Sequence, residues 1–171
     1  MRMMEMKRKL LKAELNKLAE PELWRAQMPQ CGDAIRKRDG LFYHHALYVS
    51  DDEIIHMTYG QDGIMGHEGF LETTTMEAFA SKRKIEVRQF SAEEAQDLHP
   101  IDQRIAAARK HLGKVNYDLL FSNCEHYVTF FLTGRFVSSQ VRKIVNRPIV
   151  KNQETGMNHF LGKIYNSLDQ L

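Results

Sequence analysis

The sequence has few of the features that mark secreted, membrane-spanning or nucleic-acid-binding proteins. Its 171 residues include only two cysteines, Cys31 and Cys124, too few for a disulfide framework, so a reduced intracellular protein is expected. No segment approaches the roughly 18 apolar residues of a spanning helix, and the charged residues 1–9 are unlike a signal peptide. The formal net charge is only +2, which gives no general argument for nucleic acid. We therefore expect a cytoplasmic protein with no nucleic-acid partner.

The two ends of the chain are predicted to be helical. Leucines recur at helical spacing before Pro21, and apolar residues do so again near the C-terminus. These positions are Leu11, Leu15 and Leu18, and then Leu161, Ile164 and Leu168. Residues 1–27 are therefore predicted to be an amphipathic N-terminal extension, 28–145 a catalytic domain and 146–171 a helical tail. The N-terminal helix would either dock on the domain or make peripheral contact with a membrane surface or a partner.

The central region reads as strands followed by helices. Alternating or β-branched residues predict strands at 33–37, 42–49, 53–58 and 84–88, and the glycine-rich segment 59–70 predicts a loop. Helical turns or helices are predicted at 76–80, from Ser91, at 101–112 and from Ser122 to Gly134. Ser91 with Glu94, and Ser122 with Glu125, have the spacing of capping boxes. This order predicts an α+β fold in which an antiparallel sheet packs against helices.

Cys124 lies at the predicted start of a helix. The partial positive charge of a helix N-terminus favours a thiolate, which is the nucleophilic form of cysteine. Free amide groups in the first turn can also donate to an oxyanion on an attacked carbonyl. The alternative is a buried structural cysteine, which is common for this residue type.

His44 and His56 lie on the two arms of the predicted hairpin. A three-residue turn, Ser50 to Asp52, would place His56 opposite Ala46 and His44 opposite Thr58. The two histidines would then be diagonal neighbours on one face, roughly 7–8 Å apart between backbones. A two-residue turn would send them to opposite faces.

These three residues form a candidate nucleophilic site. His44 would remove the proton of Cys124, and His56 would orient the His44 ring. His45 should face away from His44, and Tyr48 would line the site. A Cys–His–His set can also hold zinc, but no fourth ligand is evident, so no metal and no cofactor are expected.

Two motifs resemble those of the lecithin:retinol acyltransferase-like proteins. Residues 44–51 with 54–56 resemble their histidine box, and Asn123-Cys124-Glu125-His126-Tyr127-Val128 resembles their cysteine box. Cys31-Gly32-Asp33 resembles the opening Pro-Gly-Asp strand, with cysteine in place of proline. Residues 133–142 are similar to those of the H-Ras-like suppressor phospholipase/acyltransferases. Around the first histidine, Phe42 stands where the family has tyrosine, and His45 where it has another aromatic residue.

The resemblance implies a circularly permuted, papain-like fold of the NlpC type. It also implies that Cys124 takes an acyl group from a phospholipid as a thioester, with His44 as base and His56 as third member. Substrate or oxyanion contacts are expected from Asn123, Tyr48, Phe42 and Tyr43. The acceptor would be water, an amine or an alcohol. A papain-like peptidase or amidase, and a non-catalytic interaction module, remain as alternatives.

Overall fold

The computed structural model describes residues 22–40, 42–61, 67–118 and 122–141. The predicted helices near the two termini lie outside these residues. The described strands are β1 (Leu23–Arg25), β2 (Ala34–Asp39), β3 (Phe42–Ser50), β4 (Glu53–Tyr59), β5 (Glu68–Thr74), β6 (Ile85–Gln89) and β7 (Gly113–Asn116). The described helices are α2 (Met76–Ala80), the 3-10 turn η2 (Glu94–Asp97), α3 (Ile101–Lys110) and α4 (Cys124–Thr133).

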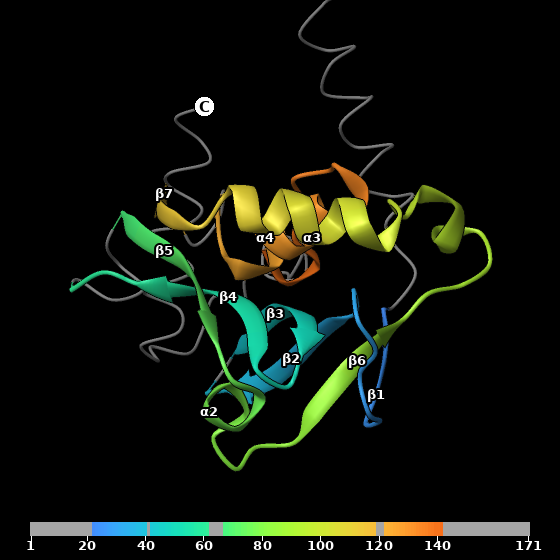
Figure 1. Ribbon diagram of the computed structural model, residues 1–171, viewed down its shortest axis with the longest axis horizontal. Helices are drawn as coiled ribbons and strands as arrows, with labels where there is room; N and C mark the ends of the chain where they lie inside the picture. The colour runs from blue at the N-terminus through green and yellow to red at the C-terminus, as the bar shows by residue number, and fades with distance from the viewer. Residues whose placement is uncertain (1–21, 41, 62–66, 119–121, 142–171) are drawn as a thin grey trace, which may run out of the picture.

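The strands form one antiparallel sheet in the order β1-β6-β2-β3-β4-β5-β7. Helices α3 and α4 lie along one face of the sheet, and α2 lies on the other side near the ends of β4 and β5 (Figure 1). The α+β architecture predicted from the sequence is therefore confirmed.

The sheet is buried on both faces because helices cover each of them. Leu47 and Ile55 face α3 and α4 and pack with Phe131, which is fully buried. Ala46 and Ile54, one residue along each strand, point to the other face, which Phe79 of α2 covers. Burying each large side chain contributes about 1.5–3 kcal/mol, so the two clusters hold the central hairpin from both sides.

Most predicted elements are present, but three strands were missed. β5 begins inside the segment predicted to be a loop, and β7 follows shortly after α3, where no strand was predicted. β1 has three residues and pairs with β6, so the sheet begins at Leu23, within the 1–27 range assigned to the extension. β1 and β7 are short strands at the two edges of the sheet, and such strands have little internal pattern, because pairing with a neighbour stabilises them more than their own sequence does.

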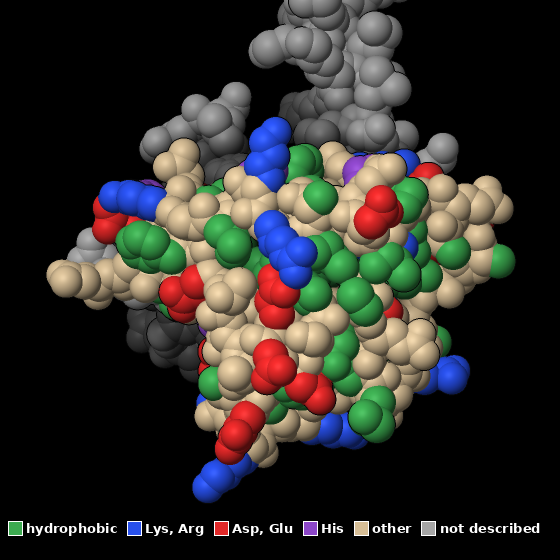
Figure 2. Space-filling view, in the orientation of Figure 1, with side chains coloured by type: hydrophobic (Ala, Val, Ile, Leu, Met, Phe, Trp, Pro, Cys, Tyr) green, Lys and Arg blue, Asp and Glu red, His purple; other side chains and the backbone are tan. Residues whose placement is uncertain are grey.

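The surface and the helices add two observations. Acidic and basic side chains lie next to one another on the face shown in Figure 2. One ion pair of the described surface joins Arg109 of α3 to Glu53 of β4. In the described ranges, no helix has both the length and the apolar character needed to span a bilayer.

Candidate active site

The β3–β4 hairpin has the predicted register but reaches it differently. Ser50 pairs with Glu53 across a two-residue turn, so the predicted three-residue turn is wrong. An irregularity between Tyr48 and Ser50 inserts one extra residue into β3 and shifts the register back. His56 therefore lies opposite Ala46, as predicted, and shares a face of the sheet with the other candidate histidine.

That second histidine, His44, is in direct contact with His56. The Nε2 atom of His44 lies 3.1 Å from Nδ1 of His56, and the two rings meet edge to face. Phe79 packs against both rings at 5.5 and 5.7 Å between centroids. On its other side, Nε2 of His56 lies 3.8 Å from the carboxylate of Glu72, its partner across β5.

The sheet divides just beyond this pair. The β3–β4 ladder ends at Ala46 and His56, so His44 does not pair with Thr58 as predicted. Residues 42–45 continue paired with β2 only, while 57–59 continue paired with β5. One edge of β3 is therefore left open beside His44.

The first turn of α4 fills this opening. Sγ of Cys124 lies 3.9 Å from the carbonyl oxygen of Tyr43, and the backbone N–H of His45 also faces the sulfur. The sulfur thus lies on the open edge of β3, level with His44. The Nδ1 atom of His44 is buried and has no hydrogen-bond partner among the described residues. The described contacts therefore place the Cys124 sulfur against the strand that carries His44, and His44 against His56.

Helix α4 is capped by residues other than those predicted. Asn123 is the N-cap: its side chain accepts from the amides of Glu125 and His126, and Nδ1 of His126 accepts from the amide of Asn123. The predicted Ser122–Glu125 box is therefore wrong, because the helix begins one residue later. Two of the first-turn amides expected to serve an oxyanion are already occupied by this cap. Gly134 ends the helix in the left-handed conformation, as predicted.

Burial determines the charges of the candidate nucleophile and base. The pKa of the Cys124 thiol is raised to about 12, mainly by burial and to a lesser extent by Glu125, although the nearby backbone amides favour the thiolate. The pKa of His44 falls to about 3 through burial first, and then through repulsion from His56 and Lys37. The expected low thiol pKa is therefore wrong for this state, because desolvation outweighs the charge of the helix end.

Lys37 is a charged neighbour that the sequence reading did not select. It pairs with His44 across β2 and β3, and its ammonium donates to the carbonyl oxygen of Phe79 at 2.5 Å. In the described part of the chain it forms no ion pair with a carboxylate, and burial lowers its pKa. This ammonium also lowers the pKa of His56, after burial.

The other predicted site residues lie in different surroundings. The Tyr48 hydroxyl donates to Asp51 at the hairpin turn, four residues along β3 from His44, so it does not reach the candidate nucleophile. The Tyr43 ring stacks under the Arg36 guanidinium, so only its backbone reaches Cys124. Phe42 begins β3 opposite Asp39 and is half-buried. His45 is buried on the opposite face from His44, as predicted, and packs against Trp24.

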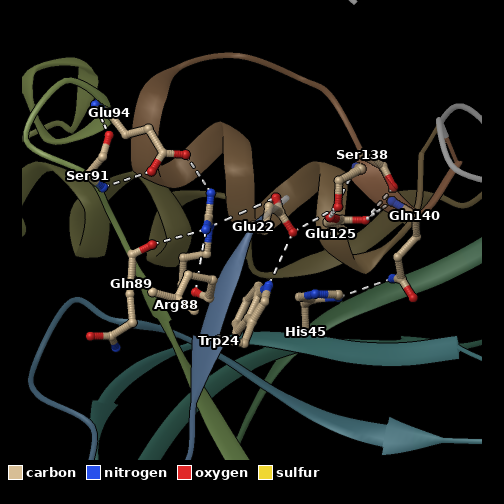
Figure 3. Close-up of polar contacts among 12 residues, drawn as sticks. Glu22, Trp24, His45, Arg88, Gln89, Ser91, Glu94, Glu125, Ser138 and Gln140 are labelled. Carbon is tan, nitrogen blue, oxygen red and sulfur yellow. Dashed lines mark hydrogen bonds and ion pairs between the residues drawn. The ribbon is translucent and has the colours of Figure 1, made fainter. Parts of the chain in front are cut away.

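Glu125 and residues 138–140 are site neighbours whose role the sequence reading missed. Glu125 is buried and accepts from the hydroxyls of both Ser138 and Ser139. Figure 3 shows Glu125 beside Ser138 and Gln140. The signal in the sequence was Glu125 itself, the one carboxylate in a mostly apolar helix. Its partners could not be identified from the sequence, because they follow the helix in a segment without a periodic pattern.

Within the described ranges, no group of three or more His, Cys, Asp or Glu side chains is arranged to hold a metal ion.

Comparison with known proteins agrees with this architecture. The family model described as lecithin retinol acyltransferase matches residues 27–137. The chain is 28% identical to mouse phospholipase A and acyltransferase 1 over 131 residues, covering 68% of this chain and 75% of the relative. It is 26% identical to the human protein of that name over 148 residues, covering 78% and 85%. It is 24% identical to bovine lecithin retinol acyltransferase over 147 residues, covering 72% and 64%.

The antiparallel sheet packed against a helix that begins at a buried cysteine is consistent with the NlpC/papain-like class of fold. The chain belongs to the lecithin retinol acyltransferase family, and it is an enzyme of the acyltransferase and hydrolase type.

Proposed function

We propose that the protein removes a fatty acyl group from a phospholipid by forming a thioester on Cys124, and then passes it to water, an amine or an alcohol. The observation that carries the proposal is the position of the Cys124 sulfur. It lies on the open edge of β3 against the backbone of Tyr43 and His45, the residues on either side of His44. Nε2 of His44 is engaged by His56, and its Nδ1 has no hydrogen-bond partner among the described residues.

The first half of the reaction begins from a neutral thiol and a neutral imidazole. His44 carries its proton on Nε2, which donates to Nδ1 of His56, so that Nδ1 of His44 can accept. As Cys124 attacks the ester carbonyl carbon, its proton moves to Nδ1 of His44. The tetrahedral intermediate collapses, the ester C–O bond breaks, and the leaving oxygen takes the proton from His44. The products are a thioester and a lysophospholipid.

The second half transfers the acyl group and restores the enzyme. The acceptor gives a proton to His44 and attacks the thioester carbon. The C–S bond then breaks, and the sulfur recovers the proton from His44. The backbone N–H of His45 faces the sulfur and is a candidate donor to charge that develops there.

The lipid substrate is favoured over a peptide by the relatives. Their names describe a phospholipase A and acyltransferase and a lecithin retinol acyltransferase. Thiol–imidazole chemistry also serves peptidases and amidases, because these too attack an acyl carbon. The cytoplasmic location remains a prediction, and peripheral membrane contact through residues 1–27 concerns a segment almost entirely outside the described residues.

The test is intact-mass spectrometry after incubation with phosphatidylcholine in mixed micelles. We expect a mass gain of one fatty acyl group, together with release of lysophospholipid. The adduct should be absent in Cys124→Ala and retained in Cys31→Ala, a matched control because Cys31 is the other cysteine and is exposed.

Two results would contradict the proposal. One is an acyl adduct that persists in Cys124→Ala, which would place the nucleophile elsewhere. The other is the absence of any adduct or lipid turnover together with cleavage of a peptide library, which would favour a peptidase.

A further inference from the structure

The open edge of β3 exposes backbone groups that must find partners. Where β4 leaves the ladder, the N–H and the carbonyl of Tyr43 have no strand to pair with. Buried backbone groups without partners are costly, so the location of these hydrogen bonds is informative.

The side chain of Gln140 takes the place of the missing strand. Its Oε1 accepts from the N–H of Tyr43 at 2.7 Å, and its Nε2 donates to the carbonyl oxygen of Tyr43 at 3.1 Å. The same Nε2 lies 3.3 Å from Nδ1 of His45 (Figure 3). Gln140 therefore contacts the residues on both sides of His44.

Glu125 holds the backbone that presents Gln140. Its carboxylate accepts from the amide of Gln140 at 3.0 Å, and from the amide and hydroxyl of Ser139 at 3.1 and 2.6 Å. The Ser138 hydroxyl donates to it at 2.5 Å. Four donors converge on this buried carboxylate, which directly follows Cys124 in the chain.

These contacts join the two halves of the candidate site. We propose that Gln140 and Glu125 are positioning residues that fix the separation between the Cys124 sulfur and the His44 imidazole. The effect of these residues on turnover rests on the proposed function, whereas the contacts themselves do not involve substrate. A misplacement of about 1 Å at a reacting centre can lower a rate on the order of 100-fold, so such a brace has a large effect.

Replacing Gln140 with glutamate tests the hydrogen bonds to Tyr43 while keeping the size of the side chain. A protonated glutamate has one acceptor and one donor and so reproduces both bonds to Tyr43, whereas an ionised glutamate has no donor. The charged or titratable groups around this position are His45 on β3, Glu125 on α4 and Glu22, which accepts from Ser139. Arg36 on β2 lies over the Tyr43 ring and is paired with Glu86. Burial beside Glu125 should keep the new carboxyl protonated at mildly acidic pH.

The experiment compares Gln140→Glu, Gln140→Ala and the control Gln103→Ala, which alters an exposed glutamine of α3. Turnover of a short-chain phosphatidylcholine is measured from mildly acidic to mildly alkaline pH, at temperatures where near-UV circular dichroism shows every variant folded. Relative to Gln103→Ala, we expect Gln140→Glu to retain its kcat at acidic pH and to lose about 10-fold or more as the carboxyl ionises. Gln140→Ala should be impaired at every pH, with KM little changed.

A second measurement on the same variants does not depend on lipid activity. Alkylation of Cys124 by iodoacetamide, relative to the exposed Cys31 in the same molecule, should show the same pH-dependent difference between Gln140→Glu and the control. If the wild type lacks lipid turnover, the proposed function fails and this ratio still tests the brace. A kcat and an alkylation ratio that match Gln103→Ala at every pH would overturn the proposal. So would an equal loss at all pH values in folded Gln140→Glu.

Discussion

In the resting protein, Cys124 and His44 should both be uncharged at neutral pH. The perturbation that tests this is a pH titration of the thiol in a Cys31→Ser background, which leaves Cys124 as the sole cysteine. The reference is the same protein unfolded in denaturant. Cysteine proteases with a preformed thiolate–imidazolium pair would behave in the opposite way.

The magnitude follows from the burial of the sulfur. Cys124 is only 6% exposed, and its pKa of about 12 lies about 3 pH units above the usual 9.0. At about 1.36 kcal/mol per pH unit, the folded protein disfavours the thiolate by roughly 4 kcal/mol. The thiolate population at neutral pH should therefore be on the order of 1000-fold lower than in the unfolded chain.

The assay combines a spectroscopic and a kinetic readout. Thiolate absorbance near 240 nm is measured as the difference between Cys31→Ser and Cys31→Ser/Cys124→Ser, and the same samples are alkylated with iodoacetamide. We expect no thiolate signal up to mildly alkaline pH, and alkylation that is far slower in the folded than in the unfolded state. The absorbance separates ionisation from restricted access, which would also slow the alkylation.

One result would refute this reasoning. A thiolate signal that appears at mildly acidic pH, with rapid alkylation of the folded protein, would show that the helix end and His44 outweigh burial. Catalysis would then begin from a preformed ion pair, rather than from proton transfer during the attack.

Three further predictions concern the surroundings of the site and the core. His56→Phe preserves packing on Phe79 but removes the contact with His44 Nε2, so kcat in steady-state turnover should fall about 100- to 10,000-fold. A kcat within about threefold of wild type would exclude an orienting role for His56. Lys37→Met removes a cation that lowers the pKa of His44, so the acid limb of the pH–rate profile should move to higher pH. Lys37→Arg keeps the charge and is the control. An acid limb that stays in place in Lys37→Met would contradict the reasoning. Phe131→Ala empties a fully buried position and should lower the free energy of unfolding, measured by urea denaturation, by about 3–5 kcal/mol. Phe136→Ala, at a site 42% exposed, should lower it far less. Equal losses in the two variants would argue against a tightly packed core around Phe131.

Local patterns in the sequence determined much of the fold. The aromatic and β-branched residues of 42–49 and 53–58 indicate two strands, and α2 was predicted with its observed bounds. Gly134 ends α4 because a left-handed residue is needed there. These features depend on residues a few positions apart, which is why they can be read along the chain.

The candidate site was also selected from the sequence, but its geometry was not. The cysteine and the two histidines stand out by residue type, and the even register follows from the requirement that both histidines share a face. The turn that achieves this register was predicted incorrectly, because an irregularity after Tyr48 compensates for a shorter turn. Such a bulge depends on how β3 fits its neighbours, so no local signal announces it.

Tertiary structure alone decided the charge of Cys124 and the support of His44. The sequence determined that a cysteine begins a helix, which by itself favours a thiolate, but insertion of that helix end into the divided sheet desolvates the sulfur and reverses the preference. Likewise, Gln140 contacts Tyr43 across 97 residues of chain, in the space where β4 leaves β3. Burial and long-range contacts are properties of the packed molecule, because they depend on which segments meet rather than on the residues within each segment.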